Sequence, residues 1–326
     1  MAHARYHSAE ERTNLYEQIT NRIIAELEAG RLPWVQPWES AKASIGMPYN
    51  AVSDRRYSGI NILTLWDAIV SRGFESHAFL TFRQAIALGG NVRRGERGIG
   101  VIYTRRFIPK EERHRADIEG REPLGGIPFL KWFTIFSVEQ CEGLPAHICE
   151  PPPPIPEGLI LPQAEALIAA TGDDFRIGGP SAFYSPANDY VQVPRPDAFH
   201  DPVNWHRTAF HELGHWAGGA ARLNRDQSGV FGSVAYGKEE LCAELTASFV
   251  CAALGITPTV RHADYIGSWL EIIRGDDRAI LRAASAASKA ADYLLSFWPE
   301  TAIAANDDDP DPDPDGSMAL AGSIAA

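Results

Sequence analysis

Two histidines and a glutamate in the second half of the chain have the spacing of a metal-dependent hydrolase site. The segment His211-Glu212-Leu213-Gly214-His215 reads H-E-x-x-H. Helical residues four apart lie on one face, about 6 Å from each other, so both imidazoles can reach one ion. A bound ion lowers the pKa of its water, and Glu212 is placed to take the proton. The spacing predicts a divalent metal bound by His211 and His215, with Glu212 as catalytic base.

The residues around this motif favour a helix with one buried side. Phe210, Leu213 and Trp216 supply an apolar face, and Gly218-Gly219 is a stop signal just beyond the second histidine. The alternative is a helix that carries two surface histidines and no ion. The apolar face makes that alternative less favourable.

A tetrahedral ion needs a third protein ligand, and the next expected helix offers Glu239, Glu240 and Glu244. The run Glu240-Leu241-Cys242-Ala243-Glu244 resembles the E-x-x-A-D element of gluzincin peptidases. In that element the first carboxylate binds the metal and the second orients a ligating histidine. The resemblance implies Glu240 as the third ligand and Glu244 as the orienting residue. Glu244 stands where the element has Asp, so the reverse assignment stays open, while Glu239 fits an ordinary acidic helix face.

This ligand set predicts one zinc ion, with manganese or cobalt as alternatives. An oxyanion stabiliser is harder to assign, because nothing in the spacing selects among the candidates. The candidates are Tyr184, Tyr190, Tyr236 and His206.

Hydrophobic periodicity and turn residues predict an α+β fold in two domains that position these groups. Helices are expected at Leu15–Glu28, Asn61–Ser71, Thr81–Leu88, Gln163–Ala170, 204–217, 238–254, 262–274 and 278–296. Strands are expected at Gly100–Phe107, Leu130–Ser137, Ala182–Ser185 and Asp189–Val193.

A run of prolines divides the chain. Residues 151–156 read Pro-Pro-Pro-Pro-Ile-Pro, which favours an extended spacer without the amide donors that helices and sheets need. We therefore expect domains at 1–148 and 161–305, joined by a Pro-rich linker at 149–160. The Asp/Pro tail at 306–326 is expected to be disordered, because it cannot bury enough apolar surface to order itself.

Composition argues against a membrane or secreted protein. No apolar run approaches the roughly 18 residues that a membrane helix needs, and the N-terminus lacks a hydrophobic signal region. The four cysteines form no C-x-x-C pair and are expected to be reduced thiols. We expect a cytoplasmic protein without a membrane partner.

Charge is distributed unevenly along the chain. The net charge is −12, yet residues 1–150 hold 19 Lys and Arg against 18 Asp and Glu, which leaves that half about neutral. Residues 151–326 hold 11 against 24, a net of −13. The overall acidity therefore does not exclude a nucleic-acid partner for the first half, and the asymmetry indicates different partners for the two halves.

Arginines cluster in two segments of the first half. Residues 83–106 contain six arginines and one acid, Glu96, and residues 91–98 form a basic loop punctuated by glycine. Exposed arginines near aromatic rings suit single-stranded DNA, which offers phosphates and unstacked bases. Solvated loop charges beside core aromatics are the alternative. The candidate DNA-binding residues are Arg55, Arg56, Tyr57, Arg83, Arg93, Arg94, Arg97, Arg105 and Arg106.

Over residues 12–298 the chain resembles the ArdC/TraC-type antirestriction proteins that conjugative plasmids and integrating elements carry. Small departures are Ser53-Asp54-Arg55, where a Thr-Gly turn is expected, and Ser137, where Asn is usual. The blocks that carry the resemblance include Thr20–Ile24, Pro33-Trp34 with Pro37-Trp38, Tyr57–Asn61, Thr81–Ala85, Phe136–Gln140, the H-E-x-x-H motif, Arg222–Arg225, Phe231–Ser233 and Glu239–Leu245.

The resemblance implies an N-terminal domain that binds single-stranded DNA and a C-terminal, zincin-like metallopeptidase domain of gluzincin type. Such a protein protects DNA that enters a cell as a single strand from restriction, and its protein substrate is unknown. Two other hypotheses remain. One is a protein that coats single-stranded DNA and holds a purely structural metal. The other is a metallopeptidase regulator that reaches DNA only through a protein target.

Overall fold

The computed structural model describes residues 9–35, 42–108, 110–121, 127–150, 157–257 and 266–298. The proline run at 151–156 and the Asp/Pro tail lie outside these residues. Within the parts of the chain that are described, no helix has the length and apolar character needed to cross a bilayer.

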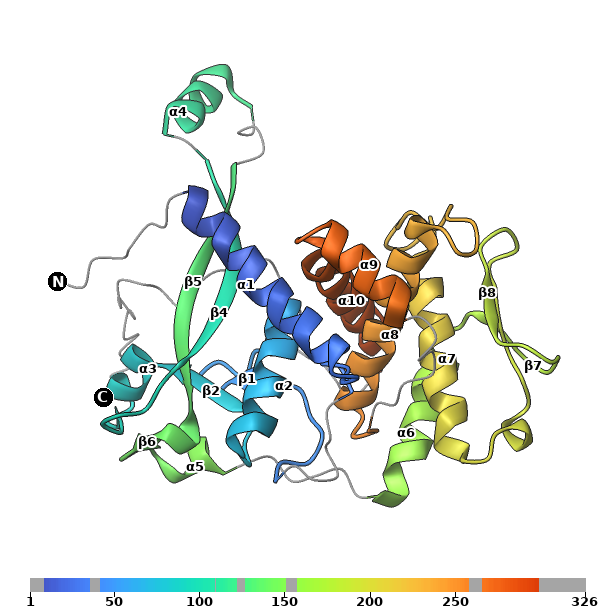
Figure 1. Cartoon of the computed structure of the whole chain (residues 1–326), viewed down its shortest axis with the longest axis horizontal. Coiled ribbons are helices and arrows are strands. Elements are labelled where there is room, and N and C mark those ends of the chain that lie inside the picture. The colour runs from blue at the N-terminus through green and yellow to red at the C-terminus, as the bar shows by residue number, and fades with distance from the viewer. Residues whose placement is uncertain are drawn as a thin grey trace, which may run out of the picture.

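The first half is α+β, as expected, and is built on a four-stranded sheet in the order β1-β2-β5-β4 (Figure 1). β1 and β2 are parallel and the other neighbours antiparallel, while β3 and β6 form a separate antiparallel pair. The elements are α1 (Ala9–Glu28), β1 (Tyr49–Asn50), α2 (Ile60–Arg72), β2 (Ala78–Thr81), α3 (Phe82–Ala87), β3 (Asn91–Val92), β4 (Ile99–Phe107), α4 (Lys110–Glu119), β5 (Ile127–Ser137), the 3₁₀ turn η2 (Val138–Gln140), β6 (Cys141–Glu142) and α5 (Ala146–Cys149).

The second half packs helices against a small sheet in the order β7-β9-β8, in which β7 and β9 are parallel and β8 is antiparallel to β9. Figure 1 shows α7 between this sheet and the remaining long helices. The elements are α6 (Glu157–Ala170), β7 (Asp174–Ile177), β8 (Phe183–Ser185), β9 (Tyr190–Val193), the 3₁₀ turn η3 (Pro196–Ala198), α7 (Pro202–Ala217), α8 (Val234–Ala253), α9 (Ile266–Gly275) and α10 (Ala279–Leu295).

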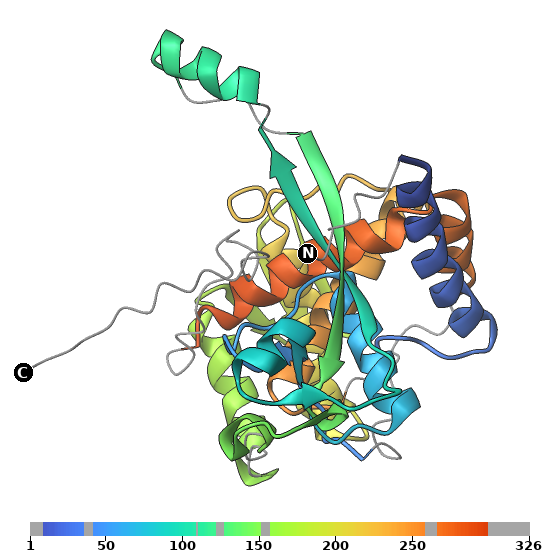
Figure 2. The same ribbon diagram turned by 90° about the vertical axis from the view of Figure 1, so that its left-hand side faces the viewer.

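β4 and β5 form a ribbon that runs past the rest of their sheet. Residues 99–107 pair with 127–135 along the whole ribbon, whereas β2 pairs only with residues 135–137 of β5. The outer part of the ribbon therefore has no third strand among the described residues. It carries α4 at its end, well away from the other helices (Figure 2).

The two halves share one hydrophobic core. Trp34 packs edge-on against Trp269 with ring centroids 5.5 Å apart, and Trp66 meets Phe249 in the same way at 5.7 Å. Such aromatic pairs contribute roughly 0.5–1.5 kcal/mol each beyond their burial. The backbone N–H of Gly59 also donates to Ser288 Oγ at 2.7 Å, in α10. The proline run thus connects two domains that are packed together.

The four predicted strands and the helices predicted at 61–71, 81–88, 204–217, 238–254 and 278–296 are confirmed within four residues. The first helix begins at Ala9, six residues before the predicted start at Leu15. The helix predicted at 262–274 is confirmed from Ile266, and residues 262–265 lie outside the described part of the chain.

Gln163 is wrong as a helix start, because α6 begins at Glu157 and runs through Pro162. Pro162 lies near the helix start, and Ile160 packs on the core, which offsets the lost donor. The elements that were not predicted are α4, α5, β1, β2, β3, β6 and β7. α4 is polar nearly all round, and β7 is largely exposed and owes its form to pairing with β9.

Candidate metal centre and basic surface

The H-E-x-x-H motif lies on α7, a helix with clear local signals at both ends. The Asp201 side chain accepts a hydrogen bond from Val203 N at 3.2 Å, Pro202 occupies the first turn, and Gly218 caps the C-terminus. His211 is 3% exposed and Glu212 is also buried. Burial rules out a helix that simply displays two surface histidines.

α8 crosses close to α7 because of a glycine inside the motif. A Cβ at Gly214 would lie 3.2 Å from Thr246 Cβ and 3.3 Å from Ala243 Cα, both on α8. Those distances are shorter than most contacts of a real Cβ, so a side chain here would push the helices apart. The glycine therefore lets α8 bring its carboxylates to the histidines.

His211, His215 and Glu240 converge on one point. Nε2 of His211 lies 3.5 Å from one Glu240 oxygen, and Nε2 of His215 lies 3.4 Å from the other. Ligand atoms of the three residues all lie within 4.8 Å of one another. Two atoms about 2.0–2.1 Å from a tetrahedral ion are separated by roughly 3.3 Å. Two imidazole nitrogens and a carboxylate at these spacings fit a divalent ion such as zinc or manganese.

A further carboxylate faces the other ring nitrogen of each histidine. Glu244 Oε2 lies 3.4 Å from Nδ1 of His211, and Glu239 Oε1 lies 3.1 Å from Nδ1 of His215. A ligating histidine commonly has a carboxylate at its second nitrogen, which fixes ring orientation and tautomer. The geometry therefore favours Glu240 over Glu244 as the third ligand and gives Glu244 the orienting position.

Glu239 is the residue that sequence reasoning missed. It was assigned to an ordinary acidic helix face, but its side chain is only 11% exposed. Arg225 donates to both of its oxygens, at 2.6 and 3.0 Å, and Gln227 donates to Oε1 at 3.0 Å. Both partners come from the loop between α7 and α8. No local pattern separates Glu239 from a solvated acid, because that loop buries it.

The carboxylates and histidines shift one another's pKa values. Burial alone would raise the pKa of Glu239, but hydrogen bonds from His215 and Arg225 outweigh it and lower the pKa to about 2. Burial would likewise lower the pKa of His211, yet the carboxylates of Glu240 and Glu244 raise it to about 10. Opposite charges held together in low dielectric produce both shifts. In the absence of metal, the cluster is a set of buried ion pairs.

The four oxyanion candidates all have other neighbours. Tyr184 donates to Asp189 at 2.8 Å, and the Tyr190 ring lies under Arg176. The Tyr236 ring packs on Phe231, and the ring of His206 packs on Trp205. The contacts named here for these four side chains are with residues other than the three candidate ligands. The structure therefore does not select an oxyanion stabiliser among them.

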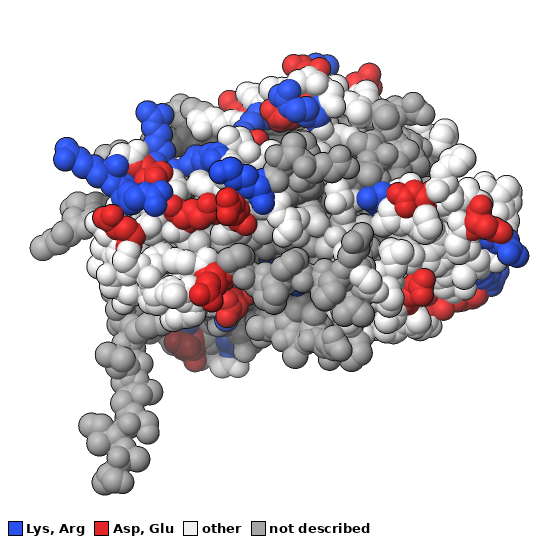
Figure 3. Space-filling view, turned by 90° about the horizontal axis from the view of Figure 1, so that it is seen from below, with Lys and Arg blue, Asp and Glu red and all other residues white. Residues whose placement is uncertain are grey.

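The arginines of α3 and of the loop after β3 are exposed. Arg93 pairs with Glu96 at 3.0 Å, whereas Arg83, Arg94 and Arg97 make no side-chain ion pair with any described residue. Figure 3 shows Lys and Arg side chains gathered at the end of the molecule formed by the first half. Arg105 and Arg106 belong to the outer part of β4, and their side chains lie outside the description.

The second predicted segment lies differently. Arg55 is exposed, but Arg56 is largely buried, and burial lowers its pKa despite the nearby charge of Asp292. Tyr57 is 5% exposed and packs edge-on against Phe79 at 6.3 Å. Its ring is enclosed by the shared core and offers no surface for a base. The position of Tyr57 contradicts its predicted role as a DNA contact.

Sequence comparison assigns a class of protein to each half. Residues 13–136 match the family described as the N-terminal domain of anti-restriction factor ArdC, and residues 162–286 match the zincin-like metallopeptidase family. The chain is 39% identical to the uncharacterized protein y4eC of Sinorhizobium fredii, over 86% of this chain and 92% of that protein. It is 35% identical to two DNA primase TraC proteins of Escherichia coli, of which it spans only 28% and 20%.

Solved structures give the same result at the level of the whole chain. The metal-free crystal structure of antirestriction protein ArdC from the R388 plasmid superposes with a TM-score of 0.71 at 35% identity, covering 87% of this chain and 97% of that one. The Mn(II)-bound structure of the same protein gives 0.72 at 34% identity, covering 88% and 99%. An ArdC-type N-terminal domain is thus joined to a zincin-like domain. The chain belongs to the ArdC family of antirestriction proteins.

Proposed function

We propose that this protein holds one divalent metal ion through His211, His215 and Glu240 and uses the site to hydrolyse a peptide bond. The convergence of these three side chains from two helices is the observation that carries the proposal. The Mn(II)-bound structure of ArdC from R388 supports a divalent ion. Zinc fits the ligand set best, with manganese or cobalt as alternatives.

The metal, when bound, supplies a Lewis acid that lowers the pKa of water and polarises a carbonyl. Glu212 adjoins His211 on α7. It is the only carboxylate in the H-E-x-x-H motif, and it is not one of the three proposed ligands. Its carboxylate accepts the proton of the attacking water and returns it to the leaving amine. Glu244 and Glu239 hold the two imidazoles at their Nδ1 atoms, which keeps both Nε2 atoms directed at Glu240.

The first half is proposed to bind single-stranded DNA. Arg83, Arg94 and Arg97 are exposed side chains without acidic partners among the described residues, and they are available for phosphates. The second half carries a net charge of −13 over residues 151–326 and repels a strand. DNA is therefore expected on the basic surface of the first half.

Together these activities form an antirestriction function: the protein binds DNA that enters as a single strand and cleaves a host protein that threatens it. Membership of the ArdC family supports this assignment. A DNA-coating protein with a structural metal is the second candidate. A regulator that meets DNA only through its protein target is the third, and it predicts no direct DNA affinity.

Glu212→Gln tests the proposal, because it removes the base and leaves all three ligands. The variant is expected to bind metal and single-stranded DNA as the wild type does but to lose protection of incoming DNA from restriction. Protection that survives with metal bound would favour the coating protein. Loss of metal binding in the variant would instead mean that Glu212 is itself a ligand, which contradicts the assigned roles.

A fluorescence titration with single-stranded and duplex oligonucleotides at two salt concentrations tests the DNA proposal. Affinity is expected to favour the single strand and to fall as salt rises, because arginine contacts release counterions. Absence of binding to either oligonucleotide at low salt would leave the regulator as the better assignment.

A further inference from the structure

The first half exposes large apolar side chains beside its basic residues. Phe82 is 50% exposed, Ile86 is 50% exposed, and Trp132 is 37% exposed. Phe82 and Ile86 lie one turn apart on α3, and Trp132 lies on β5, a strand that α3 contacts. Exposed apolar side chains that gather on one face of a well-packed domain often mark a binding surface.

Trp132 is supported on one side by a glycine. A Cβ at Gly100 would lie 1.5 Å from Trp132 Cζ2, so no other residue could occupy this position of β4 without moving the ring. Gly98 is likewise close to residues of β5, but to Thr134 rather than to Trp132, since a Cβ there would lie 2.2 Å from Thr134 Cγ2. The indole of Trp132 therefore lies over Gly100, with part of its surface open to solvent.

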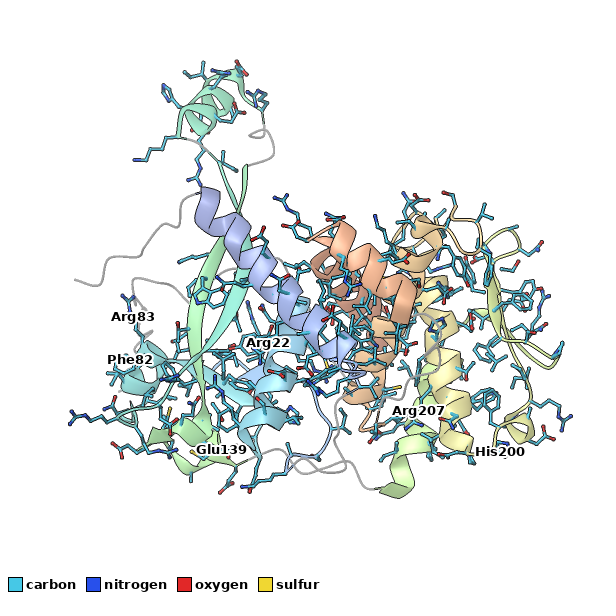
Figure 4. The ribbon with its side chains drawn as sticks, viewed as in Figure 1. Arg22, Phe82, Arg83, Glu139, His200 and Arg207 are labelled. Carbon is cyan, nitrogen blue, oxygen red and sulfur yellow. The ribbon has the colours of Figure 1, made fainter. Side chains whose placement is uncertain are left out.

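Positive charge lies next to Phe82. Arg83 follows Phe82 directly, and Figure 4 shows both side chains on the outer side of α3, away from the second half. α3 also contacts β3, and the loop that follows β3 presents Arg94 and Arg97. The acid in this loop, Glu96, is engaged by Arg93 and by Gln140, the latter at 2.9 Å. The surface therefore combines flat rings with uncompensated arginines.

We propose that Trp132 and Phe82 are the residues on which bases of single-stranded DNA stack, with Arg83 and the loop after β3 holding the phosphates. This inference rests on the proposed DNA binding and names the residues that contact the bases. Rings can stack only on bases that are not already stacked in a duplex, so the surface selects single strands. The unpaired arginines favour single-stranded DNA over an apolar protein segment. An apolar segment would remove water from the arginine charges without supplying an opposite charge.

The test compares Trp132→Ala, Phe82→Ala and Arg83→Ala by titrating a fluorescent single-stranded oligonucleotide at several salt concentrations. Trp132→Ala is expected to weaken binding roughly 5- to 100-fold with an unchanged salt slope, because stacking releases no counterions. Arg83→Ala is expected to reduce the slope by about 0.7, the contribution of one phosphate on a single strand. Trp132→Phe should restore most of the affinity, since it keeps a flat ring.

An abasic oligonucleotide of the same length separates stacking from charge. The wild type should prefer the base-bearing strand, and Trp132→Ala should largely abolish this preference. Phe231→Ala is the matched control, because Phe231 is an exposed aromatic residue of the second half and should leave DNA affinity unchanged. Circular dichroism and thermal melting confirm that each variant is folded.

If Trp132→Ala and Phe82→Ala bind the single strand as tightly as the wild type does, the stacking assignment is overturned. The proposal that the first half binds DNA would then still stand. Wild-type protein that binds no single strand at low salt would overturn both. A wild type that binds abasic and base-bearing strands equally would also overturn the assignment, whatever the variants do.

Discussion

At the scale of single residues, the roles proposed at the candidate metal centre depend on which nitrogen each carboxylate faces. Glu240 meets both Nε2 atoms, whereas Glu244 and Glu239 each meet one Nδ1 atom. A ligand and an orienting residue make different contributions to affinity, because only the ligand bonds the ion. The three glutamates can therefore be separated by measuring metal affinity.

Glu240→Gln should weaken metal binding by more than about 100-fold, whereas Glu244→Gln should cost roughly 10- to 100-fold, the range typical of a residue that supports a ligand. Competition with a chelator of known affinity gives both values. If Glu244→Gln is the more damaging change, the assignments of ligand and orienting residue are reversed.

Glu239→Gln keeps the size of the side chain but removes the charge that holds His215, Arg225 and Gln227 together. We expect a loss of metal affinity of about 10-fold or more, with zinc still bound at saturation. Asp226→Asn is a control on an exposed acid of the same loop and should change nothing. An unaltered affinity in Glu239→Gln would limit Glu239 to a structural ion pair.

At the scale of elements, the site exists because α7 and α8 approach closely at Gly214. Gly214→Leu should force the helices apart and destabilise the protein by about 1–3 kcal/mol, the usual cost of overpacking. Metal affinity should fall as well, since the ligands lie on both helices. Denaturant unfolding and metal titration measure the two effects.

Gly267→Leu is the matched control for that change. Gly267 lies on α9, and a Cβ built there meets no atom within 4 Å, so leucine should be tolerated. If Gly214→Leu binds metal with unchanged affinity, the close spacing of α7 and α8 is not what brings Glu240 to the two histidines.

At the scale of the whole molecule, the shared core couples the first half to the second half, which carries the candidate metal centre. Trp34 is fully buried against Trp269, so Trp34→Ala should cost about 3–5 kcal/mol. Because the core is common to both halves, the variant should still unfold in a single transition, at lower denaturant. Tryptophan fluorescence and circular dichroism followed together check this, and two separate transitions would show that the halves fold independently.

The sequence by itself determined the local features of this protein. The four-residue spacing of His211 and His215, the caps of α7 and the run that begins at Glu240 are all encoded within a few residues, because helix geometry fixes which side chains share a face. The same short-range logic predicted eight of the helices and the strands β4, β5, β8 and β9. It also located exposed arginines, among them Arg83, Arg94 and Arg97, but not the burial of Arg56.

Only the tertiary structure decided which side chains are buried and which meet across elements. Tyr57 looked like a base contact in its local segment, but the packing of α2 and β2 encloses it. Glu239 has the sequence surroundings of a solvated acid, but Arg225 from the loop between α7 and α8 pairs with it. The position of the Trp132 ring depends on Gly100 of the neighbouring strand, because a side chain at residue 100 would occupy the same space. Burial and cross-element contacts depend on residues far apart in the chain, and no local pattern carries that information.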